Sequence, residues 1–287
     1  MIVPSTCKNL LAATLAASAL AFAGAACATP FVFSTGDPDG KIATGSRPSS
    51  AGKIEIESAD DFVLSDHTRI TKASFTGLLP DFKNVGSVVV EIYRVFPFDS
   101  SNPPSGNVTT RVNSPSDVAF DTRSNGSGLS FATTVLNGTF TAANSVLNGI
   151  NKSANEFTGG EGAVTAQEVR FDLAFTTPFD LPAGHYFFIP QVQLTSGNFL
   201  WLSAPKPIAG GTGPFAPDLQ SWIRNETLSP DWLRIGTDIT HQGPFNAAFS
   251  LEGVTVAAVP EPESYTLMLA GLAIFGVLKR RRIARPS

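Results

Sequence analysis

Cysteine is nearly absent from this chain of 287 residues, which contains only Cys7 and Cys27. Both lie in an apolar N-terminal segment that we expect to be removed from the exported protein. The remaining body would then have no disulfide, no thiolate metal site and no cysteine nucleophile. Without such cross-links, its stability must come from the size of its core. A body of roughly 230 residues is large enough for this as one all-β domain.

Basic clusters are absent from the body as well. The chain has 20 basic and 24 acidic residues, but six of the basic and two of the acidic residues lie near its ends. The body therefore has 14 basic and 22 acidic residues and a net charge near −8. Because phosphate binding requires grouped Lys and Arg, the sequence argues against a nucleic-acid partner. A mildly acidic surface is equally consistent with a role in solubility, with binding of a divalent cation and with binding of a neutral polysaccharide.

Several enzyme signatures are missing too. The sequence contains no Gly-x-Ser-x-Gly motif, no phosphate-binding loop and no dinucleotide fingerprint. The histidines of the body, His67, His185 and His241, are far apart in the sequence, so surface or core roles are favoured over a shared metal site. Helical periodicity is missing from the body except for a short candidate at residues 142–147.

What the body does contain is a series of short β-strand patterns. Runs that are rich in β-branched and aromatic residues, or that alternate between apolar and polar residues, occur at 53–57, 70–78, 86–96, 168–175, 185–194, 198–202 and 245–256. Turn clusters separate them at 101–106, 125–128, 137–138, 158–160 and 209–217. Residues 97–116 are expected to form a long surface loop. We therefore predict an all-β fold, an antiparallel β-sandwich of jelly-roll type, whose 22 Phe residues fill the space between two sheets.

The N-terminal segment has the features of a signal peptide. Lys8 precedes an apolar run at residues 10–26, and Ala26-Cys27-Ala28 places small residues at both positions that a signal peptidase recognises. We predict a signal helix that signal peptidase removes after Ala28. A lipoprotein with Cys27 as its lipidated residue is a second interpretation. Gly24, which stands where a bulky aliphatic residue is usual, argues against it.

The C-terminal segment has three ordered elements: Val259-Pro260-Glu261-Pro262, an apolar run at residues 266–278, and the basic stop Lys279-Arg280-Arg281-Arg282. This order resembles the PEP-CTERM sorting tail of exopolysaccharide-producing Gram-negative bacteria. The resemblance implies export across the inner membrane, handling by exosortase, which is a membrane protease, and a destination at the cell surface or in the extracellular matrix. The apolar run is expected to form a short transmembrane helix. Because roughly 20 residues span a bilayer comfortably, this shorter run suits a transient inner-membrane anchor with its basic end in the cytoplasm.

The chain thus divides into a signal peptide at 1–28, a β-sandwich domain at 29–258 and a sorting tail at 259–287. Two patches of the body, Asp60-Asp61-Phe62-Val63-Leu64 and residues 181–188, resemble β-sandwich domains that are common in exported, surface-anchored bacterial proteins. This resemblance implies a fold and a location only, since one fold hosts many functions.

Asp37 and Asp39 form a candidate metal site. In Asp37-Pro38-Asp39-Gly40, two carboxylates stand one residue apart before a Gly that permits a sharp turn, as at the start of a calcium loop. An EF-hand is excluded because Pro48 occupies the position of its last ligand. A calcium site completed by distant acids such as Asp60, Asp61 or Glu252 stays open. A plain β-turn is favoured, and no cofactor is expected.

Glu55, Glu57 and Asp60 are the candidates for catalysis. Jelly-roll glycosidases place alternating carboxylates on one strand that faces a cleft, and Glu55 and Glu57 would share a face. The order of the acids departs from the order in those families, and no Trp lies nearby in the sequence. A solvent-exposed strand face, with Ile54 and Ile56 on its other side, is the favoured interpretation. No catalytic residue is therefore assigned.

All three Trp residues lie late in the body, which is the best positive indication of a ligand site. Trp201 has apolar neighbours on both faces of its strand and is expected in the core. Trp222 and Trp232 have polar neighbours such as Gln220 and Asp231, and we expect them to reach the surface. An exposed aromatic ring can stack on a sugar ring. Trp222 and Trp232 thus form the predicted ligand platform.

Two classes of function follow from these features. The leading hypothesis is an exported, surface-sorted, non-enzymatic β-sandwich protein of the extracellular exopolysaccharide matrix, for which carbohydrate binding at that platform is the open question. The alternative is an extracellular carbohydrate-active hydrolase that uses acidic residues on a jelly-roll face. The first requires an exposed aromatic platform, and the second requires paired carboxylates with perturbed pKa values in a cleft.

Overall fold

The computed structural model describes residues 28–102, 104–150, 157–207 and 218–256, together with Met268, Leu269, 271–273, Phe275, Gly276 and Lys279. The signal segment before Ala28, the sorting motif at 259–262 and the basic residues at 280–282 lie outside the described residues. Thr29–Val256 form one compact unit, which we call the body. The described residues of the C-terminal segment are helical. No helix among the residues that the structure describes is long and apolar enough to cross a membrane.

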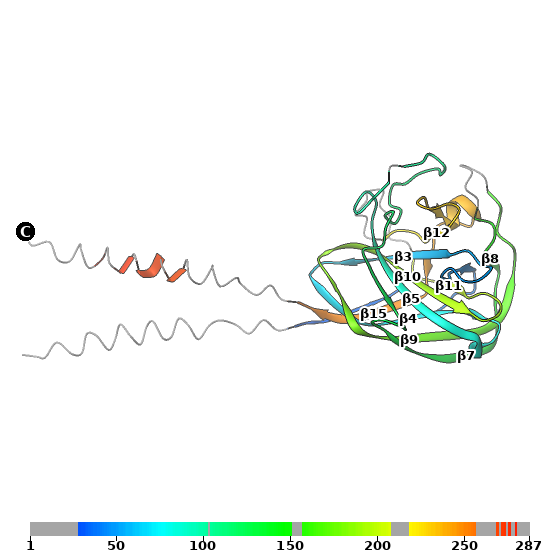
Figure 1. Ribbon diagram of the computed structural model, residues 1–287, viewed down its shortest axis with the longest axis horizontal. Helices are drawn as coiled ribbons and strands as arrows, with labels where there is room; N and C mark the ends of the chain where they lie inside the picture. The colour runs from blue at the N-terminus through cyan, green and yellow to red at the C-terminus, as the bar shows by residue number, and fades with distance from the viewer. Residues whose placement is uncertain are drawn as a thin grey trace, which may run out of the picture. The chain divides into compact units, whose positions relative to one another are not determined.

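The body consists of two β-sheets (Figure 1). The main path of the larger, nine-stranded sheet is β1 (Pro30–Ser34), β15 (Phe249–Thr255), β4 (Thr68–Leu79), β11 (Leu200–Ala204), β2 (Ile42–Gly45) and β8 (Asn144–Val146). From β4 the sheet also extends through β9 (Val164–Leu181) to β7 (Ser130–Ala142), and β14 (Asn246–Ala247) pairs with β11. The six-stranded sheet has the order β13 (Leu233–Arg234), β12 (Trp222–Asn225), β3 (Ile56–Leu64), β10 (Gly184–Leu194), β5 (Val85–Arg94) and β6 (Asp121–Ser124). The 3₁₀ helix η2 (Phe82–Asn84) leads into β5, and the π-helix η3 (Ile235–Ile239) follows β13.

The main core lies between the two sheets. Phe62 and Phe188 face it from β3 and β10, while Phe75 and Phe249 face it from β4 and β15, and all four are buried. The rings of Phe188 and Phe249 stack with 5.1 Å between their centroids. Because strand residues alternate between the two faces of a sheet, every second residue of these strands reaches the core. The prediction of two packed sheets filled by Phe is confirmed, whereas the jelly-roll type stays a prediction.

A second apolar layer covers the outer face of the smaller sheet. Phe187 on β10 and Trp222 on β12 point away from the main core and pack with Tyr93 and Trp232. The segment between β5 and β6 lies against this layer, since the carbonyl of Ser116 accepts a hydrogen bond from the Trp232 indole at 3.3 Å. The predicted long loop at 97–116 therefore contains buried residues and is not purely a surface feature.

Arg111 anchors this segment to the rest of the body. Its guanidinium binds Asp117 and Asp231, with 2.6 Å between Nη1 and Oδ1 of Asp231. Both carboxylates are fully enclosed, and Ser105 also donates to Asp231. Buried carboxylates of this kind are tolerated only when they are paired and hydrogen-bonded. The segment is thus held to the sheet by ion pairs as well as by packing.

Three local predictions are wrong. Residues 142–147, expected as a short helix, contain β8, which pairs in parallel with β2. Asn137-Gly138, expected as a turn, lies inside β7, where two register shifts against β9 absorb the irregular residues. Of the strand expected at 53–57, only Ile56 and Glu57 belong to β3. In the first two cases pairing with a distant strand overrides the local sequence preference.

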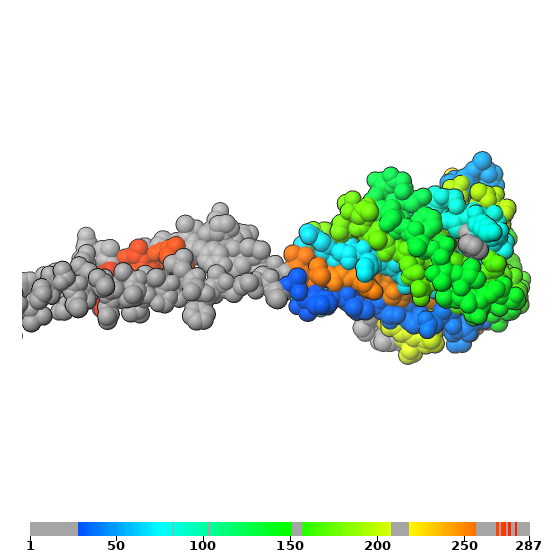
Figure 2. All heavy atoms as spheres, turned by 90° about the horizontal axis from the view of Figure 1, so that it is seen from below, coloured from blue at the N-terminus to red at the C-terminus, as the bar shows by residue number. Residues whose placement is uncertain are grey.

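The first and last strands of the body are neighbours. β1 pairs with β15 in antiparallel register, with Pro30 opposite Val254. Figure 2 shows the two strands side by side on the surface, β1 in blue and β15 in orange. The first and last strands of the body therefore hold each other in place, and the chain enters and leaves the body at the same end of this strand pair.

Candidate functional site

Trp222 and Trp232 do not form an exposed platform. Trp222 is 1% exposed and Trp232 is 0% exposed, so the prediction that they reach the surface is wrong. Trp222 lies on β12 opposite Ala59 of β3. Trp232 packs edge-to-face on Tyr93, with 5.7 Å between the ring centroids. Both rings belong to the second apolar layer and are closed to a ligand.

The polar residues that suggested exposure of these rings have partners inside the protein. Asp231 is fully buried and binds Arg111. Gln220 accepts a hydrogen bond from the Thr237 hydroxyl at 2.7 Å. A polar residue next to a Trp in the sequence therefore does not show that the Trp is exposed, because the polar residue can bind a partner inside the protein. Trp201, predicted to be interior, is confirmed in the core.

A buried charged network lies beside the two rings. Arg224 on β12 binds Glu57 on β3 through Nε, and its Nη2 donates to the Tyr93 hydroxyl at 2.8 Å. That hydroxyl donates in turn to Oε1 of Glu57 at 2.8 Å. The Arg224 guanidinium also lies over the Trp232 ring, 4.3 Å from its centroid. Glu57 and Arg224 are both buried, and each neutralises the charge of the other. Either charge buried alone would destabilise the fold.

Two further carboxylates border this network. Glu91 on β5 lies 3.4 Å from the Tyr93 hydroxyl. Burial, followed by the negative charge of Glu57, raises the pKa of Glu91 from 4.5 to about 8. Glu55 accepts a hydrogen bond from Gln191 at 2.9 Å, and burial and the charge of Glu57 raise its pKa as well. The interpretation of Glu55 and Glu57 as one solvent-exposed face is wrong for Glu57, which is enclosed by its partners.

Asp60 and Asp61 hold β3 to neighbouring segments. Asp60 accepts hydrogen bonds from the Ser221 hydroxyl at 2.9 Å and from the backbone N–H of Ala247 at 2.8 Å. One oxygen of Asp61 lies 2.5 Å from Nε2 of His185, and the side chains of both residues are 1% exposed. Burial raises the pKa of both aspartates. Their contacts are structural, because both carboxylates are buried and hydrogen-bonded within the body.

Asp37 and Asp39 lie in a turn before β2. Oδ1 of Asp39 accepts hydrogen bonds from the Ser203 hydroxyl at 2.5 Å and from the N–H of Lys41 at 3.0 Å, and Oδ2 is 3.1 Å from the Lys41 ammonium. Within the described part of the chain, no group of three or more His, Cys, Asp or Glu residues could hold a metal ion. The contacts of Asp39 are those of a hydrogen-bonded turn, which is the favoured interpretation, and a calcium site stays the alternative interpretation.

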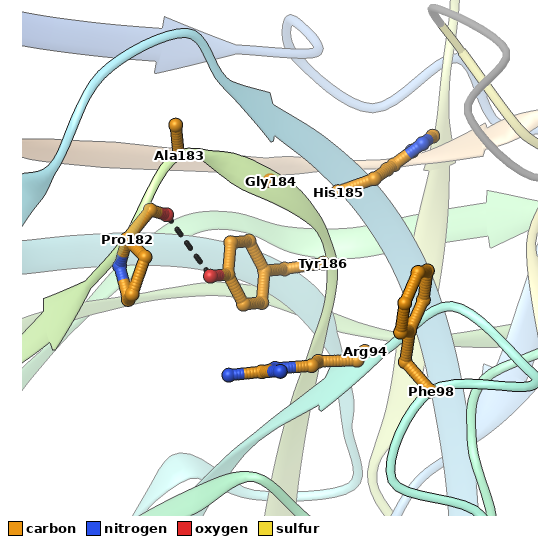
Figure 3. A pocket seen from close by; sticks show the side chains of 7 residues that line it. All are labelled: Arg94, Phe98, Pro182, Ala183, Gly184, His185 and Tyr186. Atoms are coloured by element: carbon orange, nitrogen blue, oxygen red, sulfur yellow. Dashed lines mark hydrogen bonds between the residues drawn. The ribbon is translucent and has the colours of Figure 1, made fainter.

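A cavity of about 170 Å³ opens where β9 turns into β10 (Figure 3). It is lined by Arg94, Phe98, Pro182, Ala183, Gly184, His185 and Tyr186. Arg94 ends β5, and Phe98 follows it in the segment before β6. The Tyr186 hydroxyl donates to the carbonyl of Pro182 at 2.9 Å, which fixes the turn between the two strands. We call this feature the Arg94 cavity.

Arg94 supplies the positive charge of the cavity. Its Nε lies 3.0 Å from Oδ2 of Asp99, and the two side chains are 30% and 35% exposed. The guanidinium also covers the Phe120 ring, 4.1 Å from its centroid. Figure 3 shows Arg94 extending along the Tyr186 ring, whereas His185 points to the opposite side of β10. The cavity thus joins a solvent-accessible cation to aromatic walls.

This combination suits a polar ligand that has an apolar face. Phe98 is 44% exposed, and its ring can stack on the C–H face of a sugar. The guanidinium of Arg94 can donate to hydroxyl oxygens of the same ligand. At about 170 Å³, the cavity is smaller than the roughly 300 Å³ from which drug-sized pockets begin.

No local sequence pattern identifies Arg94 and Tyr186 as neighbours. Arg94 and Tyr186 come together because β5 and β10 pair, with these two residues directly opposite each other. The one available signal was the patch at 181–188, which resembles part of an exported domain and contains the turn that lines the cavity.

The tail of the chain matches a known family model. Residues 258–282 match the PEP-CTERM protein-sorting motif, which confirms the resemblance seen in the C-terminal segment. The motif indicates an exported protein that exosortase processes and that is sorted to the cell surface or beyond. The class of this protein is therefore a sorted, exported protein with a β-sandwich body. Searches of curated proteins and of solved structures found no match to the chain.

Proposed function

We propose that this protein is a non-enzymatic component of the extracellular polysaccharide matrix and that its body binds carbohydrate at the Arg94 cavity. The observation that carries this proposal is the PEP-CTERM motif at residues 258–282, because the resemblance associates such tails with exopolysaccharide-producing bacteria. In this proposal the body is a sandwich of jelly-roll type. The tail anchors it transiently in the inner membrane until exosortase releases it.

The charge of the body favours a neutral polysaccharide as the ligand. A net charge near −8 repels acidic polymers over most of the surface. Asp99 partly offsets the single cation of the Arg94 cavity. Affinity would then come mainly from stacking on Phe98 and from hydrogen bonds to Arg94, which act on uncharged sugars.

The position of the carboxylates supports a non-enzymatic role. None of the residues that line the Arg94 cavity is an Asp or Glu. Both oxygens of Glu57 are occupied, one by Tyr93 and the other by Arg224. Carboxylates in such pairs stabilise a fold, whereas a glycosidase requires them free on either side of a bound sugar.

The test is to pass the purified body over a panel of immobilised polysaccharides while measuring both retention and released sugar. Phe98→Ala should weaken retention about tenfold, because one stacked ring contributes about 1 kcal/mol or slightly more. Val112→Ala is the matched control, since Val112 is 56% exposed in the same segment but does not line the cavity. Unchanged retention in Phe98→Ala would remove the cavity from the proposal. A body retained by no polysaccharide would refute carbohydrate binding itself.

A carbohydrate-active hydrolase is the second candidate function. One observation favours it: Glu91 has a pKa raised to about 8 and stands beside the carboxylate of Glu57, and glycosidases use carboxyl pairs of unequal pKa. Sugar release that Glu91→Gln abolishes and Phe98→Ala leaves unchanged would establish this candidate.

A further inference from the structure

The larger sheet ends in a long strand that has one neighbour. β7 (Ser130–Ala142) contains thirteen residues and pairs, among the described residues, with β9 alone. It lies at the outer edge of this sheet (Figure 1). The ladder to β9 is regular from Ser130 to Val135, and register shifts interrupt it beyond that point. In the regular part, every second residue directs its backbone N–H and C=O away from β9.

This regular part lacks the usual protection of an edge strand. β7 contains no charged residue and no proline, and the uncharged stretch extends over residues 124–151. Val135 and Leu136 are 38% and 41% exposed. Edge strands of monomeric proteins usually carry charged residues, prolines or bulges that prevent pairing with another chain. Here the bulges occur only beyond Val135, so the first half of the strand is open to a partner.

A second copy of the same strand is the occupant that the self-complementarity of an antiparallel edge favours. Two bodies with a net charge near −8 repel each other over most of their surfaces. A contact between them therefore needs a patch without charge, and β7 provides one. Two identical strands in antiparallel register are complementary about a twofold axis, and the assembly closes at two copies.

The two ends of the main path of this sheet are poorer partners for β7. β1 has five residues and β8 has three, against thirteen in β7. A contact between β7 of one copy and β1 of the next would leave most of β7 unpaired. It would also continue without closing, which produces filaments.

We propose that β7 is a homodimer interface in which the Ser130–Val135 segments of two copies pair antiparallel and join two larger sheets into one. Phe131 packs toward the main core, so Ala132 and Thr134 lie on the opposite face of the sheet. A twofold axis at the centre of this segment passes beside Ala132 or Thr133. The two Ala132 residues then lie directly opposite or diagonal to each other. Dimer formation through β7 does not depend on carbohydrate binding.

The test measures the oligomeric state of the body by sedimentation over a wide range of concentrations. The body can be studied by itself because it is one compact unit whose first and last strands pair. We expect a monomer–dimer equilibrium. Ala132→Lys should raise the dimer dissociation constant about tenfold or more, because like charges on facing strands repel. Within one copy the new Lys lies opposite Asp172 of β9, which favours folding of the variant.

Val32→Lys is the matched control. Val32 is 73% exposed on β1, and its substitution makes the same change in net charge at the other end of the sheet. It should leave the dimer intact. A parent protein that stays monomeric at every concentration would refute the proposal. So would filaments, or a dimer that Val32→Lys dissociates and Ala132→Lys does not.

A thiol cross-link tests the geometry with a smaller change. The body contains no cysteine, so Ala132→Cys introduces a single thiol per copy. A short bifunctional thiol reagent should link two copies of Ala132→Cys and should not link copies of Val32→Cys. This variant keeps the proposal testable if Ala132→Lys fails to fold. Absence of a covalent dimer in folded Ala132→Cys would contradict pairing through β7.

Discussion

Trp232 is fully buried. Its truncation should leave a cavity, because the ion-paired side chains around it cannot move in to fill the space. We expect Trp232→Ala to lower the free energy of unfolding by about 3–5 kcal/mol. Denaturant unfolding followed by circular dichroism measures this loss. Phe98→Ala serves as the control, because Phe98 is 44% exposed and should lose much less. Equal stability of Trp232→Ala and the parent would contradict the burial of this ring.

Glu91 makes the stability of the body depend on pH. Burial and the charge of Glu57 raise its pKa from 4.5 to about 8, so the folded body retains a proton that the unfolded chain has already released. The free energy of unfolding therefore falls as the pH rises from about 4.5 to about 8. Glu91→Gln removes this titration, so the variant should lose less stability than the parent across that window. Denaturant midpoints at about pH 5 and about pH 8 test the sign.

Asp60 and Asp61 act in the same direction, because burial raises their pKa values too. They are present in both proteins, so the parent and Glu91→Gln should both lose stability as the pH rises. The difference between the two proteins in the slope of the free energy of unfolding against pH measures the contribution of Glu91. Equal slopes, or a steeper fall in the variant, would mean that Glu91 is already ionised in the folded body across this window.

At the scale of elements, the segment between β5 and β6 depends on one guanidinium. Arg111→Met would leave Asp117 and Asp231 buried without a cation, and we expect a loss of about 3–5 kcal/mol in the free energy of unfolding. Limited proteolysis should also cleave residues 97–110 faster. The triple variant Arg111→Met/Asp117→Asn/Asp231→Asn should recover much of the loss, since no unpaired charge is left. A triple variant as unstable as the single one would show that shape, not charge, holds the segment.

The strands that were predicted correctly are those whose own residues favour an extended chain. The patterns at 86–96 and 185–194 correspond closely to β5 and β10, because dense β-branched and aromatic residues favour an extended chain in many contexts. β7 was missed, since its Thr-rich sequence is interrupted by Asn137-Gly138, which in isolation favours a turn. Pairing with β9 on both sides of that dipeptide decides the outcome.

The side on which a residue lies was harder to predict than the strand itself. Trp232 donates to a carbonyl 116 positions away, and Asp231 binds a guanidinium 120 positions away. Contacts at such separations depend on the packing of the whole sheet and leave no local pattern. The same holds for the Arg94 cavity, which exists only because two strands pair. The sorting tail, in contrast, is a linear signal and could be identified completely from its letters.

At the scale of the whole molecule, the body should fold without either terminal segment. A protein ending at Ala258 should melt at the same temperature as the mature chain that retains the tail, because Thr29–Val256 form a compact unit of their own. A fall of many degrees in the midpoint, measured by calorimetry, would make the tail structural. Reductant should leave the midpoint unchanged, since both cysteines precede the body. Mass spectrometry of the exported protein checks this last point, and an N-terminus at a lipidated Cys27 would contradict it.

The place of β15 in its sheet also has a mechanical consequence. β15 is the last strand before the tail, and it lies between two neighbours, with five residue pairs to β1 and seven to β4. If the tail anchors the body as proposed, tension on the anchored body acts along this strand. Both ladders are then loaded lengthwise, so their hydrogen bonds share the force and must fail together instead of opening one at a time. In that case, β15 can be pulled out of the sheet only if its hydrogen bonds to β1 and to β4 break together.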